Sequence, residues 1–126
     1  MSLEEFEDFV FSATNLDWAK ESKKQDIIKK MIDKANRARI IGKDTDISFS
    51  IKGRQGIKCD GHRNMPDGEV FVAPDENDIE GHIAYSYPAV RYGKEVDGIR
   101  LWFKKGKIVK YSATKNLDML KAAINT

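Results

Sequence analysis

The residues best suited to chemistry lie in one stretch, residues 61–74, where a rigid turn leads into a strand that opens with a carboxylate. Pro66 fixes its own backbone φ, and Pro66 and Gly68 suit positions i+1 and i+3 of a type I turn with Asp67 between them. Glu69 then starts the strand, so its carboxylate has little positional freedom, as a metal ligand requires. The pattern indicates a preorganised metal ligand, and a well-made turn followed by a surface glutamate is the alternative interpretation.

Two histidines and one cysteine are weaker candidates. His62 shares the segment with Glu69, and we interpret it as a polar residue lining the turn, with a ligand role as the alternative. His82 falls in a predicted strand and is expected on the sheet surface. Cys59 is the only cysteine, so it forms no internal disulfide. A lone cysteine at a strand end is typical of a small packed hydrophobe, and the pattern around it supplies no third group that would orient a thiol nucleophile.

Three segments have helical periodicity and surround a long β-rich region. The predicted helices cover residues 2–13, 17–36 and 116–125. Ser2 and Glu5 fit a capping box, and Asn116 is a candidate N-cap. In the second helix we expect an apolar stripe to face inward, formed by Ile28, Met31, Ile32 and Ala35.

Alternation of apolar and polar residues predicts strands between these helices. They are expected near residues 39–41, 47–51, 56–59, 69–72, 82–87, 99–103 and 108–111, the last two forming a hairpin. Glycines recur at short intervals through this region, which favours a strongly curved sheet. We therefore predict an α+β fold in which helices pack on a small, strongly curled, mostly antiparallel β-barrel-like sheet. A single domain is expected over residues 1–126, helical over 1–36, β-rich over 37–113 and ending in a C-terminal helix over 114–126.

Composition narrows the function classes. The net charge is only +2, from 22 basic and 20 acidic residues, so we expect neither a nucleic-acid nor a membrane partner. The opening residues are acidic and lack the apolar core of a signal peptide, which predicts a cytoplasmic location.

The segment also resembles the signature of the thermophilic metallo-aminopeptidases, the family of aminopeptidases T and S. The family pattern Asn-Met-Pro-Asp-Gly-Glu-Val-Phe stands at residues 64–71 and is followed by Ala73-Pro74. Further elements of the family occur in the same order along nearly the whole chain, namely Thr45-Asp46-Ile47, Gly53-Arg54, Gly81-His82-Ile83, Pro88-Ala89 and the Gly-x-Glu-Val-x-Gly-Ile pattern at residues 93–99.

The resemblance implies a two-metal site in which Glu69 is one ligand, with Asn64, Asp67 and Gly68 shaping the turn that places it. In the family, the other ligands are a glutamate in a Gly-Glu-Leu-Gly motif, histidines, and an aspartate in a His-x-Asp motif. Neither motif occurs in this sequence. The resemblance therefore implies that residues 1–126 are a central segment of a longer enzyme.

We accordingly expect the parent to be a metallo-aminopeptidase that removes N-terminal residues from peptides with divalent metal ions, whether zinc, cobalt or manganese, and that forms a homodimer. We expect the isolated chain to be inactive. Two other interpretations stay open. One is a small β-barrel module that binds single-stranded nucleic acid through aromatic and basic residues such as Trp102 and Lys104. The other is a structural or dimerisation segment of the parent.

Overall fold

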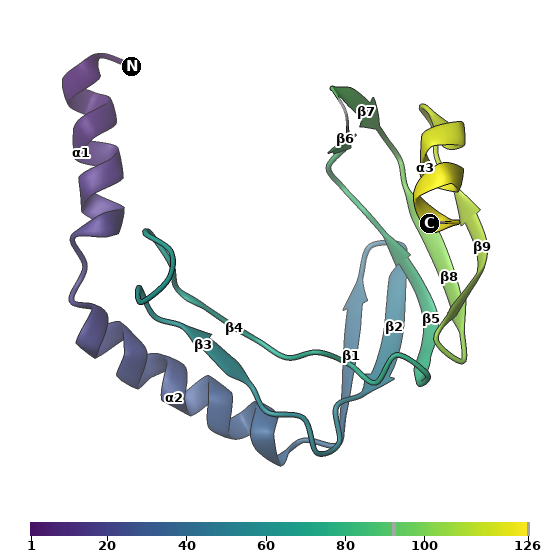
Figure 1. Ribbon diagram of the computed structural model, residues 1–126, viewed down its shortest axis with the longest axis horizontal. Helices are drawn as coiled ribbons and strands as arrows, with labels where there is room; N and C mark the ends of the chain where they lie inside the picture. Colours follow the sequence, from purple (N-terminus) through teal and green to yellow (C-terminus); the bar gives the residue numbers. More distant parts are fainter. Residues whose placement is uncertain (92, 126) are drawn as a thin grey trace. The chain divides into compact units, whose positions relative to one another are not determined.

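The computed structural model describes residues 1–91 and 93–125 of the chain (Figure 1). Tyr92 and Thr126, which fall in the predicted β-rich region and C-terminal helix, lie outside the described residues. The described part forms three helices and nine strands, and its strand ladders are antiparallel. The predicted α+β class is therefore confirmed. No helix in the described ranges is long and apolar enough to cross a membrane.

The chain divides into two compact units, each assembled from two stretches of sequence. The first unit, residues 1–35 with 53–73, contains α1 (Leu3–Thr14), α2 (Trp18–Lys34), β3 (Ile57–Cys59) and β4 (Glu69–Phe71). The second unit, residues 36–52 with 74–126, contains β1 (Arg37–Gly42), β2 (Thr45–Ser50), β5 (Ile79–Ala84), β6 (Ala89–Arg91), β7 (Lys94–Val96), β8 (Arg100–Lys104), β9 (Lys107–Ser112) and α3 (Leu117–Ile124). A single domain over residues 1–126 stays a prediction.

The helices begin where the sequence predicts. At α1, Ser2 Oγ accepts the Glu5 N–H at 3.2 Å while Glu5 Oε2 accepts the Ser2 N–H at 2.6 Å, which is the predicted capping box. Asp17 caps α2 by accepting the Lys20 N–H, and the helix ends at Lys34, short of the predicted residue 36. Asn116 occupies the N-cap of α3, but its side chain donates to the Glu95 carbonyl oxygen instead of capping the helix.

The expected inward stripe of α2 is only partly present. Ile32 and Ala35 are half-buried, but Ile28 is 51% exposed and Met31 is 69% exposed, whereas the polar Gln25 is only 5% exposed. The reason is that α2 packs against β3 and β4 through a polar face, where Gln25 Nε2 donates to the Cys59 carbonyl oxygen at 2.9 Å. A buried polar group of this kind is stable only when it is hydrogen-bonded, so this contact fixes which face of α2 meets the hairpin.

The predicted barrel is also wrong. The main sheet of the second unit has the strand order β1-β2-β5-β8-β9 (Figure 1), and closure would require β1 to pair with β9. Instead β1 bonds to β2 and β9 bonds to β8, so the described sheet is open. The frequent glycines that suggested a curled sheet mainly serve turns: Gly53, Gly93, Gly98 and Gly106 all have positive φ. Strands β6 and β7, which the sequence pattern did not predict, form a separate two-stranded sheet.

The open sheet has one polar and one apolar face. Register places Asp46, His82, Trp102 and Lys110 opposite one another across β2, β5, β8 and β9. Because side chains alternate along a strand, the neighbouring residues Ile47, Ile83 and Leu101 lie on the other face. Helix α3 contributes Leu120 to a small core with Val96 and Ile99, and Leu101 packs against that core.

Gly81 in the central strand β5 gives a stability prediction. Its φ is +113°, and an added Cβ would collide with the Asp46 carbonyl oxygen and the backbone of Ile47. Since the backbone conformation and the collision both oppose a side chain, we expect Gly81→Ala to lower the free energy of unfolding by about 3 kcal/mol or more. Urea denaturation of the chain measures this loss.

Gly93 is the matched control in the same unit. It has a φ of +72°, but the space that a methyl group would occupy is open, with nothing within 4 Å. Gly93→Ala should cost only about 1 kcal/mol, from the left-handed backbone alone. Equal losses for the two variants would contradict the close approach of β2 and β5 at Gly81.

Candidate functional site

The candidate ligand Glu69 is held by the β3–β4 hairpin of the first unit. Glu69 is the first residue of β4, as predicted, and stands directly opposite Cys59 in the register. The Gly68 N–H donates to the Cys59 carbonyl oxygen at 2.9 Å and closes the loop at this point. Alternation puts Glu69 and Cys59 on the same hairpin face as the Ile57–Phe71 pair. The side chain of Glu69 is exposed, so its carboxylate is accessible.

The loop before Glu69 differs from the predicted turn. The chain bends over residues 61–66, the Met65–Pro66 peptide bond is cis, and no hydrogen-bonded type I turn forms. The Gly68 N–H that would close such a turn is used by the hairpin instead. Asp67 has a different local role, because its Oδ2 accepts the Gly61 N–H at 3.2 Å across the base of the loop. Gly68 has a φ of +126°, a conformation that favours glycine directly before the strand.

A cavity of about 370 Å³ opens beside the hairpin. Its lining joins both hairpin strands with the loop: Ile57, Lys58, Cys59, Asp60, His62, Arg63, Asn64, Asp67, Glu69 and Phe71. Among the described residues, no group of three or more histidine, cysteine, aspartate or glutamate side chains is arranged to hold a metal ion. An exposed, backbone-fixed carboxylate fits the role of one ligand for a hard or borderline divalent metal, and a complete site needs further ligands.

Cys59 interacts with the candidate ligand directly. Its Sγ lies 3.7 Å from Glu69 Oε1, within reach of a weak S–H hydrogen bond. Burial raises the pKa of the Cys59 thiol, and the negative charges of Asp67 and Glu69 raise it further. A thiol kept in its protonated form is a poor nucleophile, so the geometry favours a supporting contact to Glu69 over covalent catalysis.

Polar contacts from α2 anchor the hairpin. Lys58 Nζ donates to Asp26 Oδ1 at 2.7 Å and to Ser22 Oγ at 2.8 Å. Asp33 Oδ1 accepts the Gly56 N–H at 2.8 Å just before β3. The hydrogen bond from Lys58 lowers the pKa of Asp26, which is therefore ionised near neutral pH. These anchoring residues were not predicted from the sequence, although Ser22, Asp26 and Asp33 share one face at helical spacing and mark a polar stripe.

The two histidines lie in different units. His62 is 84% exposed, and its Nδ1 lies 2.7 Å from Asp60 Oδ1 in the loop that leads to Glu69. His82 belongs to β5 of the second unit, opposite Asp46 and Trp102, which agrees with the predicted place on the sheet surface.

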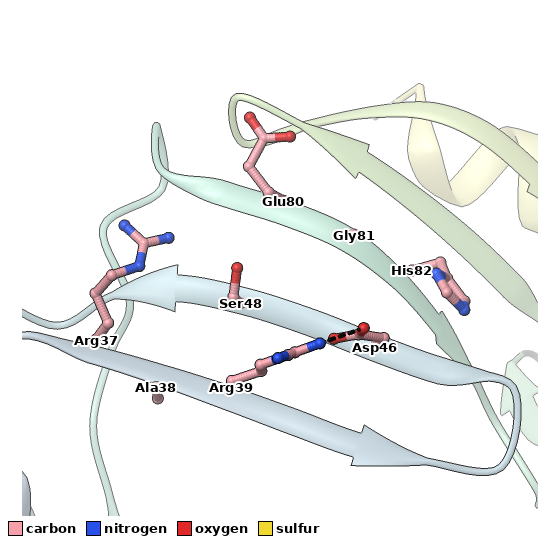
Figure 2. A pocket seen from close by; sticks show the side chains of 8 residues that line it. All are labelled: Arg37, Ala38, Arg39, Asp46, Ser48, Glu80, Gly81 and His82. Carbon is pink, nitrogen blue, oxygen red and sulfur yellow. Dashed lines mark hydrogen bonds and ion pairs between the residues drawn. The ribbon is translucent and has the colours of Figure 1, made fainter.

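A second, more open cavity of about 620 Å³ lies on the polar face of the five-stranded sheet (Figure 2). Figure 2 shows Arg39 beside Asp46, and the two side chains make hydrogen bonds of 2.8 and 2.7 Å. Arg37 bonds in the same two-pronged way to Asp78, at 2.6 and 3.3 Å. Because these cations are neutralised by carboxylates of the same unit, the face offers little net charge to a phosphate backbone.

Comparison with known proteins identifies the family. A family model described as thermophilic metalloprotease (M29) matches residues 1–126, so the chain belongs to this family. The chain is 33% identical over 63 residues to aminopeptidase 2 of Geobacillus stearothermophilus, and 35% identical over 73 residues to aminopeptidase T of Thermus aquaticus. It is also similar to the solved structure of wild-type AmpT from Thermus thermophilus, with a TM-score of 0.72 and 24% identity, which supports the fold.

The chain spans only a small part of these relatives. The alignments cover 50% and 58% of this chain but 15% and 17% of the two aminopeptidases. The structural match covers 86% of this chain and 30% of the Thermus thermophilus protein. The family match over residues 1–126 confirms the resemblance that was inferred from residues 64–71 and the other motifs.

The anchoring of the hairpin predicts a pH-dependent effect of Lys58→Met. A carboxyl whose pKa is lowered by folding contributes stability above its ordinary pKa of about 4, and that contribution is lost as the pH falls through the lowered value. Lys58→Met should therefore destabilise the chain near neutral pH. The difference from wild type should narrow in strong acid, as the pH falls through the lowered pKa and Asp26 becomes protonated in both proteins. Urea unfolding at the two pH values measures it.

Lys24→Met is the control for this experiment. Lys24 pairs with Glu21 at 2.6 Å on the same helix, and 61% of its side chain is exposed. Removal of such a surface pair should change stability little at either pH. A Lys58→Met effect of the same size at both pH values would mean that Asp26 is not the partner that matters.

Proposed function

We propose that this chain is the part of a metal-dependent aminopeptidase that supplies Glu69 to a two-metal site. The observation that carries the proposal is the placement of Glu69. In a chain of a metalloprotease family, an exposed carboxylate stands at the first position of β4, directly after the signature loop and at the edge of a cavity. Removal of N-terminal residues from peptides is the activity that the names of the relatives suggest.

The residues of this chain would hold and orient the ligand. The Cys59–Glu69 register and the Gly68 N–H bond fix the backbone of Glu69. The Cys59 thiol lies against Oε1 of Glu69, which biases the carboxylate rotamer and leaves Oε2 available. A divalent metal pair bound there would polarise the scissile carbonyl and lower the pKa of a bound water. Fixing ligands before the metal arrives reduces the cost of ordering them.

The remaining ligands would come from outside residues 1–126. One carboxylate supplies at most two oxygens, and a two-metal site needs several carboxylate and imidazole ligands. Zinc, cobalt and manganese all accept such ligands, so the metal is left open. A peptide substrate, a homodimeric parent, a cytoplasmic location, and the lack of nucleic-acid and membrane partners stay predictions.

The isolated chain is expected to be inactive. Because a partial ligand set cannot hold two metals, residues 1–126 should hydrolyse no aminoacyl-p-nitroanilide, with or without added zinc or cobalt. The assay is release of nitroaniline by the purified chain, with a longer polypeptide that contains the missing motifs as the positive control. Metal-dependent turnover proportional to the concentration of the short chain would contradict the proposal that it is a segment.

Glu69→Gln in the longer polypeptide tests the ligand. The amide keeps the shape of the side chain but removes the charge, and it is a poor ligand for a metal that activates water. We expect turnover to fall on the order of a hundredfold or more, with loss of bound metal. The fold should survive because Glu69 is exposed at a strand end. Metal content and peptide turnover are measured on the same preparation.

Asp67→Asn is the matched control, two residues away in the same loop. Asn retains an oxygen that can accept the Gly61 N–H, so the loop contact can persist and activity should change little. If Glu69→Gln kept both metal and turnover while Asp67→Asn lost them, Asp67 would be the ligand and the assignment of Glu69 would be wrong.

A further inference from the structure

The loop before Glu69 contains a hydrogen-bonded aspartate–histidine pair. This pair does not hold the β3–β4 hairpin together, and the proposed ligand role of Glu69 does not require it. His62 Nδ1 lies 2.7 Å from Asp60 Oδ1. An ionised carboxylate only accepts hydrogen bonds, so Nδ1 must carry the proton that joins the two groups. The lone pair of a neutral His62 is then on Nε2, the nitrogen that points away from Asp60. This is the arrangement by which proteins fix the tautomer and direction of a working imidazole.

Asp60 is held in place from the helix. Its other oxygen, Oδ2, accepts a hydrogen bond from Ser22 Oγ of α2 at 2.7 Å, and Lys58 Nζ lies 3.9 Å from the same oxygen. The side chain of Asp60 is only 15% exposed. The hydrogen bond from Ser22, and next that from His62, lowers the pKa of Asp60, so the carboxylate is ionised when it faces the imidazole.

This arrangement differs from an ordinary surface ion pair. Such pairs join two mobile side chains and contribute little to stability. Here one partner is largely buried and anchored to a helix more than thirty residues earlier in the chain, whereas the other is 84% exposed. A rigid acceptor that directs an exposed imidazole stabilises the fold very little, but it sets the direction of Nε2. His62 also lines the same cavity as Glu69.

We propose that His62 is the proton-transfer group of this cavity, with Asp60 and Ser22 as the residues that position it. The proposal rests on the proposed peptidase function. As a water oxygen bonds to the scissile carbonyl carbon, the carbonyl electron pair moves onto its oxygen and Nε2 takes a proton from the water. When the carbon–nitrogen bond breaks, Nε2 returns that proton to the leaving amine. Water is consumed, His62 is regenerated, and no oxidant or reductant is needed.

Charged groups around the cavity set the conditions for this role. The groups that line it with His62 are Lys58, Asp60, Arg63, Asp67 and Glu69, together with the Cys59 thiol. Asp60 contacts the imidazole directly, at 2.7 Å. The imidazole must be neutral to accept a proton from water. Activity that depends on His62 should therefore be lost when the imidazole is protonated.

The first test is the tautomer of His62, read from the imidazole nitrogen shifts of the ¹⁵N-labelled chain. We expect neutral His62 to carry its proton on Nδ1, and Asp60→Ala, which removes the acceptor, to abolish this preference while leaving His82 unchanged. A His62 that carries its proton on Nε2, or that does not respond to Asp60→Ala, would overturn the proposal whatever the activity of the parent.

The second test is kinetic and uses the longer polypeptide. We expect His62→Gln to lower kcat by about a hundredfold or more, to leave KM and metal content near wild type, and to remove the acid limb of the pH profile. His82→Gln, the matched control on β5, should keep all four properties. Since His62 is exposed, its substitution should not disturb folding, which circular dichroism checks.

The outcomes separate the two proposals. A wild-type polypeptide that binds metal but cleaves no peptide removes the proposed function, and the role of His62 with it. An active wild type whose His62→Gln variant keeps the normal kcat and pH profile removes the role of His62 alone. Loss of metal together with activity in His62→Gln would make His62 a metal ligand, and would also overturn the proton-transfer role.

Discussion

The first unit depends on the carbonyl oxygen of Cys59, which accepts two hydrogen bonds at once. One comes from the Gly68 N–H and closes the hairpin, and the other comes from Gln25 Nε2 of α2, each at 2.9 Å. Because Cys59 is the register partner of Glu69, both bonds act on the residue pair that presents the candidate ligand. Buried carbonyls that accept two donors resist displacement, since both bonds must break before the strand can shift.

The β3–β4 hairpin contacts α2 through polar groups, namely the Cys59 carbonyl oxygen and the side chain of Lys58. Lys58 alternates with Cys59 and faces Ser22 and Asp26 of α2, while Cys59 and Glu69 face away. Because side chains alternate along a strand, neighbouring residues of β3 point to opposite faces of the hairpin. One face attaches to the helix through hydrogen bonds, and the other presents a carboxylate, a thiol and the Ile57–Phe71 pair to the cavity.

Local signals could be predicted from the sequence where neighbours in the chain decide the outcome. The capping box at Ser2 and Glu5 and the strand start at Glu69 both depend on residues a few positions apart, and both are present. The barrel and the inward stripe of α2 depend on partners distant in the chain. The barrel prediction was wrong, and only half of the predicted stripe is partly buried. Periodicity identifies an apolar stripe on α2 but does not say whether this chain covers it, and Ile28 and Met31 stay exposed.

The candidate site shows the same division. Asn64, Asp67 and Glu69 could be named as candidates because one short motif contains them. The Asp60–His62 pair and its link to Ser22 were not, since Ser22 and Asp60 lie 38 residues apart and only folding brings them to 2.7 Å. A sequence pattern can indicate a candidate ligand such as Glu69. The groups that orient His62, namely Asp60 and Ser22, are identified only from the packing of α2 against the hairpin.

The open sheet of the second unit has a consequence for how copies of this chain behave toward one another. Its outer strands β1 and β9 have no further strand beside them in the described residues, and an unpaired strand edge is a template for aggregation. Strand β9 carries Lys107 and Lys110, and both side chains are exposed. Two β9 edges that approach each other bring like charges together before backbone hydrogen bonds can form. The lysines therefore oppose pairing between two β9 edges. In a closed barrel this edge would not exist, so such protection would not be needed.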